Sequence, residues 1–158
     1  MTAPSAIVRG TPAGIQLEEG FSATLAMENL TTISFWEKTM GAPAIEGGDP
    51  IDQSTMHNTT WMTQLPPTLL KLESFTLTAA YDPNLISQAI AQKNVNQTLT
   101  VTWPDGSTLS FYGWLRKTEF ADMSHGTLPE VTITLEASNI DPTTMTEEAP
   151  VYVDVAGT

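Results

Sequence analysis

The 158-residue chain is long enough for one domain with a hydrophobic core, and 41% of its residues are hydrophobic. Only 15% are charged, and 18 acidic residues against 6 basic ones give a formal net charge of -12. Binding to nucleic-acid phosphates or to an anionic membrane needs a basic patch, which these scattered bases cannot form, so both functions are excluded. The absence of cysteine excludes disulfides and thiol chemistry.

The first part of the chain predicts an extended arm followed by strands. Residues 1–20 are rich in Gly and Pro and contain only short apolar pairs, so they are interpreted as an N-terminal arm. Apolar residues then alternate with polar ones over 21–27 and 33–40, which predicts two strands. We expect a single domain over 1–158, with a β core over 21–139.

A long loop is predicted over residues 41–65, because its Gly and Pro residues prevent a helix or a central strand. Loops longer than about 12 to 15 residues are uncommon in compact domains and are usually functional or disordered. This one contains too many large apolar residues for disorder, which indicates that a partner covers them. The expected contact residues are Ile45, Gly47, Gly48, Asp49, Ile51, Met56, Trp61 and Met62. Trp36 and Trp61 flank the loop, and either they pack on each other at its base or they belong to an interface.

The second part of the chain predicts one helix among strands. A strand is expected over 74–81, a helix over 83–94 with Asp82 as its N-cap, and a strand over 97–103. A tight turn at 104–107 leads into a strand at 108–116, and an extension of this strand to 122, past a bend near Gly113, is left open. The last strong strand is predicted at 131–135, and 140–158 is interpreted as a C-terminal arm with a possible edge strand at 151–155.

These elements together predict a mainly β fold, a β-sandwich or small barrel with one α-helix packed on it, a long projecting loop and extended terminal arms. Trp103, Phe111 and Trp114 lie among apolar neighbours on strands and are predicted to be core residues.

The chain has few residues that could perform catalysis. His57 and His125 are in predicted loops, and neither has a second His at metal-ligand spacing. A metal site could be assembled from Glu46, Asp49, Asp52 and His57, but the alternate-position ligands of a calcium loop are lacking. Asp122, Ser124 and His125 have the residue types of a triad, without a nucleophile elbow. We therefore expect no catalytic residues, no cofactor and no metal, and a protein that is not an enzyme.

Five stretches carry a resemblance to a known family. They are ISFWEKTM (33–40), EGGDPIDQSTMHNTTWMTQLPPTLLKL (46–72), TLTAAYDPN (76–84), TVTWPDGSTLSFYGWLRKTEF (100–120) and VTITLEASN (131–139). In this order they resemble the tail tube (major tail) proteins of bacteriophages with long non-contractile tails, the siphophage type. The resemblance covers most of the chain and includes no catalytic signature.

The resemblance implies a virion protein that assembles with itself into hexameric rings, stacked as a hollow tube through which DNA passes without specific binding. It implies that the long loop and both arms contact neighbouring subunits, and that the other partners are tape-measure, terminator and distal tail proteins. The location would be the virion tail, after assembly in the host cytoplasm. A negatively charged lumen would let DNA slide, and its candidate acids are Glu73, Glu119 and Glu136.

Two alternatives remain open at the level of sequence. One is another ring-forming tail or secretion-tube protein, such as a tail terminator or a baseplate ring subunit. The other is a β-sandwich ligand-binding module that uses Trp61, Trp114 and the acidic residues of the loop.

Overall fold

The computed structural model describes residues 23–30, 35 and 37–154. The predicted N-terminal arm, the first residues of the strands predicted at 21–27 and 33–40, Trp36 and residues 155–158 lie outside this range. Within it the protein is mainly β with one α-helix, as the sequence predicts. In the described part of the chain, no helix is long and apolar enough to span a membrane.

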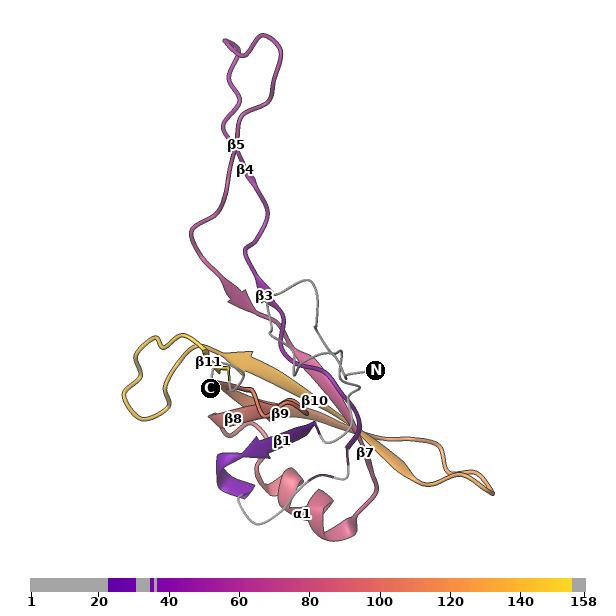
Figure 1. Ribbon diagram of the computed structural model, residues 1–158. Helices are drawn as coiled ribbons and strands as arrows, with labels where there is room; N and C mark the ends of the chain where they lie inside the picture. The colour runs from indigo at the N-terminus through magenta and orange to yellow at the C-terminus, as the bar shows by residue number, and fades with distance from the viewer. Residues whose placement is uncertain (1–22, 31–34, 36, 155–158) are drawn as a thin grey trace, which may run out of the picture.

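One antiparallel sheet forms the body of the molecule (Figure 1). Its main path has the strand order β1-β8-β9-β10-β7-β2, and β11 pairs with the first residues of β9. The strands are β1 (Thr24–Met27), β2 (Glu37–Met40), β7 (Phe75–Ala80), β8 (Gln97–Thr102), β9 (Thr108–Phe120), β10 (Glu130–Ser138) and β11 (Val151–Val153). A 3-10 turn, η1 (Glu28–Leu30), follows β1. The predicted C-terminal edge strand is thus confirmed, and it lies against β9.

Apolar and polar residues alternate along each strand, so most of the apolar side chains lie on one face of the sheet. The hydrophobic core is on that face. Leu99 and Val101 of β8, Leu115 of β9 and Ile133 of β10 are fully buried. The opposite face, called the outer face below, is half-buried and carries mostly hydroxyl groups. Its hydroxyl-bearing residues include Thr76, Thr78, Thr98, Thr100, Thr102, Thr108, Ser110, Thr132 and Thr134.

The sheet curves until its two edge strands approach each other. β1 and β2 lie at opposite ends of the strand order, yet the backbone N–H of Leu25 in β1 donates to the Glu37 carboxylate in β2 at 3.1 Å. The buried Gln97 carboxamide of β8 accepts from the Asn29 backbone N–H at 2.9 Å and holds the turn after β1. The body is therefore an incompletely closed barrel, bridged at its seam by a side chain.

The α-helix, α1 (Pro83–Ala91), begins as the sequence predicts and ends earlier. The Asp82 side chain caps its N-terminus by accepting from Asn84 N–H at 3.0 Å, and Leu85, Ile86 and Ala89 are buried against the sheet. The predicted end near Asn94 is wrong, because Asn94 has a left-handed φ of 61° and donates its N–H to the Leu115 carbonyl at 3.0 Å. The chain thus leaves the helix to bond with β9.

Strand β9 is continuous through Gly113, so the bend predicted there is wrong. Pairing with β10 shifts by one residue instead between Thr134–Lys117 and Leu135–Leu115, which leaves Arg116 as a bulge. The predicted turn at 104–107 is confirmed: Gly106 has a φ of 88°, and its N–H donates to the Trp103 carbonyl at 2.9 Å.

The three aromatic residues predicted to be core residues have different positions. Phe111 is buried, and Trp103 is half-buried against the core. The prediction for Trp114 is wrong, because strand alternation places the buried Leu115 on the core face and Trp114 on the outer face, opposite Glu136.

Candidate subunit interface

An arm formed by residues 41–73 connects β2 to β7 and projects far beyond the sheet (Figure 1). Two short antiparallel ladders hold it: β3 (Ile45–Glu46) pairs with β6 (Lys71–Leu72), and β4 (Ile51–Asp52) pairs with β5 (Gln64–Leu65). The projecting loop predicted over 41–65 is therefore confirmed as a projection, but its internal pairing and its extension beyond residue 65 were not predicted. The segment is a long hairpin, and it returns to the sheet only at residue 73, where the Glu73 N–H donates to the Ala44 carbonyl at 2.9 Å.

Glycine and proline residues separate the two ladders. Gly48 has a φ of 77° and faces Pro67, since a Cβ added to Gly48 would lie 3.4 Å from the Pro67 Cγ. Pro50 and Pro66 lack a backbone N–H and cannot extend either ladder. These residues interrupt the pairing between the two ladders without ending the hairpin.

Asn58 organises the tip of the arm, which is the turn between β4 and β5. Its side-chain amide donates to the Trp61 carbonyl at 2.8 Å and to the Thr63 hydroxyl at 2.9 Å, and its side-chain oxygen accepts from the Thr55 N–H at 2.9 Å. Asp52 stabilises the same turn, and hydrogen bonds from Ser54 lower the pKa of its carboxyl. Sequence reasoning assigned no role in the turn to Asn58, although an Asn in a short polar segment is a signal for such side-chain-capped turns.

The tip exposes its large apolar side chains to solvent. Met56 is 100% exposed and Trp61 is 82% exposed, and Met62 is also exposed. Trp36 lies outside the described residues; the exposure of Trp61 favours the interface alternative for this side chain over packing at the base of the loop.

The structure places every predicted contact residue in the arm and adds three more. Ile45 and Ile51 lie in the two ladders, and Gly47, Gly48 and Asp49 lie between them. Sequence reasoning missed the exposed residues of the returning strand, Leu65, Leu69 and Leu70. For Leu69 and Leu70 the signal was an apolar pair shortly after Pro66-Pro67.

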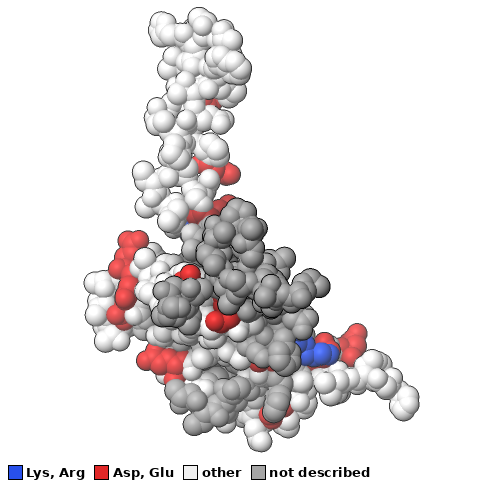
Figure 2. All heavy atoms as spheres, in the orientation of Figure 1, with Lys and Arg blue, Asp and Glu red and all other residues white. Residues whose placement is uncertain are grey.

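The outer half of the arm is free of formal charge. From Gln53 to Leu70 the sequence has no Asp, Glu, Lys or Arg, and no other uncharged run in this chain of net charge -12 is as long. Figure 2 shows acidic residues at the base of the arm and over the body, whereas the outer part of the arm has very few. Because like charges repel, this is the part of the surface that can approach another acidic protein with the least electrostatic cost.

A groove of about 1000 Å³ lies where the base of the arm meets the outer face of the sheet and the C-terminal segment. Its ionic lining is balanced, with Lys71 and Arg116 against Glu136 and Glu147. Its apolar lining consists of Ile45, Leu69, Leu70, Leu72, Trp114, Ala137, Ala149 and Pro150. We call it the arm-base groove. Sequence reasoning did not find it, since its walls come from five separate segments.

The three candidate lumen acids do not form one cluster. Glu119 of β9 is opposite Thr132 of β10, and Glu136 lies four residues after Thr132 in β10. Both glutamates are therefore on the outer face of the sheet. Glu136 pairs with Arg116 at 3.2 Å, and Glu119 pairs with Lys117. Glu73 lies at the foot of the arm, 3.6 Å from the Lys71 ammonium.

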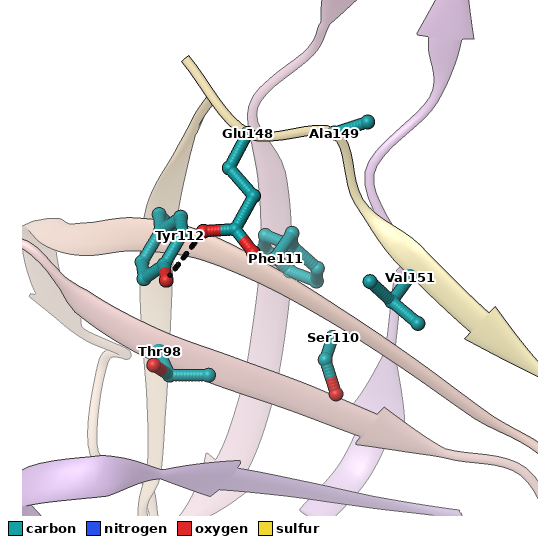
Figure 3. A pocket seen from close by; sticks show the side chains of 7 residues that line it. All are labelled: Thr98, Ser110, Phe111, Tyr112, Glu148, Ala149 and Val151. Carbon is teal, nitrogen blue, oxygen red and sulfur yellow. Dashed lines mark hydrogen bonds between the residues drawn. The ribbon is translucent and has the colours of Figure 1, made fainter. Parts of the chain in front are cut away.

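A small pocket of about 70 Å³ marks the place where the C-terminal segment crosses β9 (Figure 3). The Tyr112 hydroxyl of β9 donates to the Glu148 carboxylate at 3.0 Å, and Tyr152 of β11 packs edge-on against Trp103 with ring centroids 5.9 Å apart. The Glu148 hydrogen bond, followed by burial and nearby acids, raises the pKa of Tyr112 to about 12. This pocket is too small for an organic ligand. The contacts around it attach the C-terminal segment to the sheet.

Replacing Glu148 with Ala is expected to lower the pKa of Tyr112 towards 10, in a titration followed by absorbance at 295 nm. Because the folded-state pKa lies above the unfolded one, this tyrosine stabilises the fold below about pH 10 and loses that effect as the pH rises to 12. Tyr112→Phe identifies the signal by removing it, and Glu147→Ala is the matched control. An unchanged late-titrating tyrosine in Glu148→Ala would contradict the assignment.

The residues examined for catalysis or metal binding are not gathered into a site. In the described part of the chain, no group of three or more His, Cys, Asp or Glu residues is placed to hold a metal ion. His57 lies at the arm tip, far along the chain from Glu46, and the Ser124 hydroxyl lies 2.8 Å from the Thr127 hydroxyl in the loop that also contains Asp122 and His125.

Comparison with known proteins shows a shared fold. No protein-family model matches the sequence, and no curated protein is significantly similar to it. A chain of the anti-feeding prophage (AFP) baseplate, solved by cryo-EM with 6-fold symmetrisation, aligns over 84% of this protein and 91% of that chain, with a TM-score of 0.59 and 8% identity. A type six secretion system protein aligns over 82% and 90% with 12% identity and a TM-score of 0.44. The protein therefore shares its fold with a chain of the AFP baseplate.

Proposed function

We propose that this protein is a structural subunit of a phage tail, and that it assembles with itself into rings stacked as a tail tube. The observation that carries the proposal is the projecting arm, whose exposed apolar tip and uncharged outer half are typical of a surface that a protein partner covers. The shared fold with a chain of the AFP baseplate supports the tail-type context.

Head-to-tail assembly agrees with the shape of the molecule. The arm leaves the sheet at the Phe75 end of β7, whereas the hairpin loop 121–129 leaves it at the Ala80 end, where Ala80 pairs with Glu130. Contacts between two different surfaces generate rings when the rotation closes and filaments when it does not. A protein with its main projection at one end is suited to stacking, and the proposed number of six subunits in a ring agrees with the symmetry of the AFP baseplate.

The outer face of the sheet is the surface we assign to the channel. It is rich in hydroxyl groups, and its cations Arg116 and Lys117 are each paired with a carboxylate. DNA phosphates bind proteins chiefly through unpaired Lys and Arg, so such a surface would let DNA pass without holding it. In this proposal Glu119 faces the lumen, whereas Glu136 lies at the end of the outer face that forms the arm-base groove. The protein is a virion component assembled in the host cytoplasm. It has no catalytic activity, and it contacts tape-measure, terminator and distal tail proteins.

Electron microscopy of the purified protein, with light scattering over a concentration series, tests the proposal. Hollow filaments of uniform width are the expected result. A particle that stays monomeric up to high concentration, also when mixed with preformed tails, would overturn it.

A second candidate, a baseplate ring subunit, is favoured by one observation, namely that the solved structure with a TM-score of 0.59 is a baseplate. It predicts discrete rings that do not stack, which the same micrographs distinguish from filaments.

A further inference from the structure

No described residue covers the apolar tip of the arm or fills the arm-base groove, and the two surfaces cannot meet within one chain. The tip contains Trp61, and the groove wall contains Leu70, nine residues further along a returning strand. Nine residues of extended chain correspond to roughly 30 Å. The β4–β5 ladder lies between the two regions and keeps the arm extended (Figure 1). A contact between the tip and the groove is therefore possible only between two copies.

The charges of the two surfaces fit such a contact. The tip has no formal charge, and the groove has two basic and two acidic side chains, of which Arg116 and Glu136 form an ion pair at 3.2 Å. Elsewhere two copies of a chain with a net charge of -12 repel each other. The tip and the groove can approach without that repulsion.

The groove also has the size and lining that a Trp anchor requires. Its volume of about 1000 Å³ is at the upper end of the range in which pockets enclose drug-sized molecules. Trp114 lines it from the outer face of the sheet, and Leu69 and Leu70 line it from the arm. Buried aromatic anchors in apolar pockets supply much of the energy of protein interfaces. Trp61, with Met62 beside it, is an exposed side chain of the type that forms such anchors.

We infer that the arm tip of one copy, with Trp61 as its anchor, occupies the arm-base groove of the next copy. The inference rests on the proposed function and names the surface that receives the arm. Leu69 and Leu70 of the groove belong to the arm of the receiving copy. The base of that arm therefore contacts the inserted tip, while its own tip is inserted into a third copy. The contact joins two different surfaces, so each copy both inserts a tip and receives one.

Site-directed disulfide cross-linking tests this inference, because the natural chain has no cysteine. Thr60→Cys labels the tip and Ala149→Cys labels the groove, and both positions are exposed. The two variants are mixed, allowed to assemble, and oxidised. A disulfide forms only when the two Cα atoms approach within about 7 Å. We expect a Thr60→Cys/Ala149→Cys heterodimer as the main product, in at least tenfold excess over the product with Ser87→Cys, an exposed control on α1.

The rival occupant of the groove is the loop 121–129, which exposes Met123 and Leu128. If Ala149→Cys forms its disulfide with Met123→Cys and not with Thr60→Cys, the inference is overturned. Normal filaments without the tip–groove disulfide also overturn it and leave the proposed function intact. Conversely, a cross-linked dimer that never grows supports the contact and contradicts the tube. A protein that stays monomeric in every mixture contradicts both.

Discussion

Replacing residues 47–70 with Asn-Gly is expected to give a folded monomer that no longer assembles. Glu46 and Lys71 are paired directly across the β3–β6 ladder, so a two-residue turn can join them without altering the register. The removed residues are exposed except for the half-buried Pro67, and none belongs to the core. The free energy of unfolding should therefore change by about 0.5 kcal/mol or less in urea titrations.

The expected effect on assembly is at least a hundredfold rise in the concentration at which light scattering detects filaments. Trp61→Ser with Met62→Ser, in an otherwise intact arm, should cause most of this loss, because it removes two exposed apolar side chains and adds no charge. Thr59→Ser with Thr60→Ser is the matched control at the same tip. Normal filaments from the shortened protein would refute the role of the arm. A deletion of 44–55 is less informative, since it removes β3 and β4 and leaves β5 and β6 without partners.

Gly113→Ala is expected to lower the free energy of unfolding by about 3 kcal/mol, since there is no room for a side chain at this position. A Cβ there would lie 2.5 Å from the Glu136 carbonyl oxygen and 2.8 Å from the Leu99 Cδ1. The carbonyl is part of the β9–β10 ladder and cannot move independently, so the central strands must shift.

Urea denaturation measures this effect, and Gly47→Ala is the matched control. A Cβ at Gly47 meets nothing within 4 Å, so its free energy of unfolding should stay within about 0.5 kcal/mol of the natural protein. Equal stability of the two variants would show that the strands at Gly113 adapt more readily than their packing indicates.

Several features of the fold could be read from short stretches of sequence, because their causes are local. The period of two over 97–103 and 131–135 marked strands with one buried face, and Asp82-Pro83 marked the start of the helix. Pro104 and Gly106 marked the hairpin turn. The apolar residues at the tip were also recognisable as candidates for contact, since a charge-poor, apolar segment between glycines and prolines has nothing nearby to cover it.

The remaining features depend on which segments lie side by side. Ile45 pairs with Leu72, a partner far along the chain, and no local pattern marks that pairing, so the projecting loop was predicted without its ladders. Trp114 was assigned to the core by its apolar neighbours, whereas the register with Glu136 places it on the outer face. The arm-base groove exists only because β3, β6, β9, β10 and the C-terminal segment converge there. The sequence by itself determined the helix, the strands and the apolar tip of the arm, since propensity and alternation are local. The tertiary structure alone decided the arm-base groove, since the groove is built from long-range contacts.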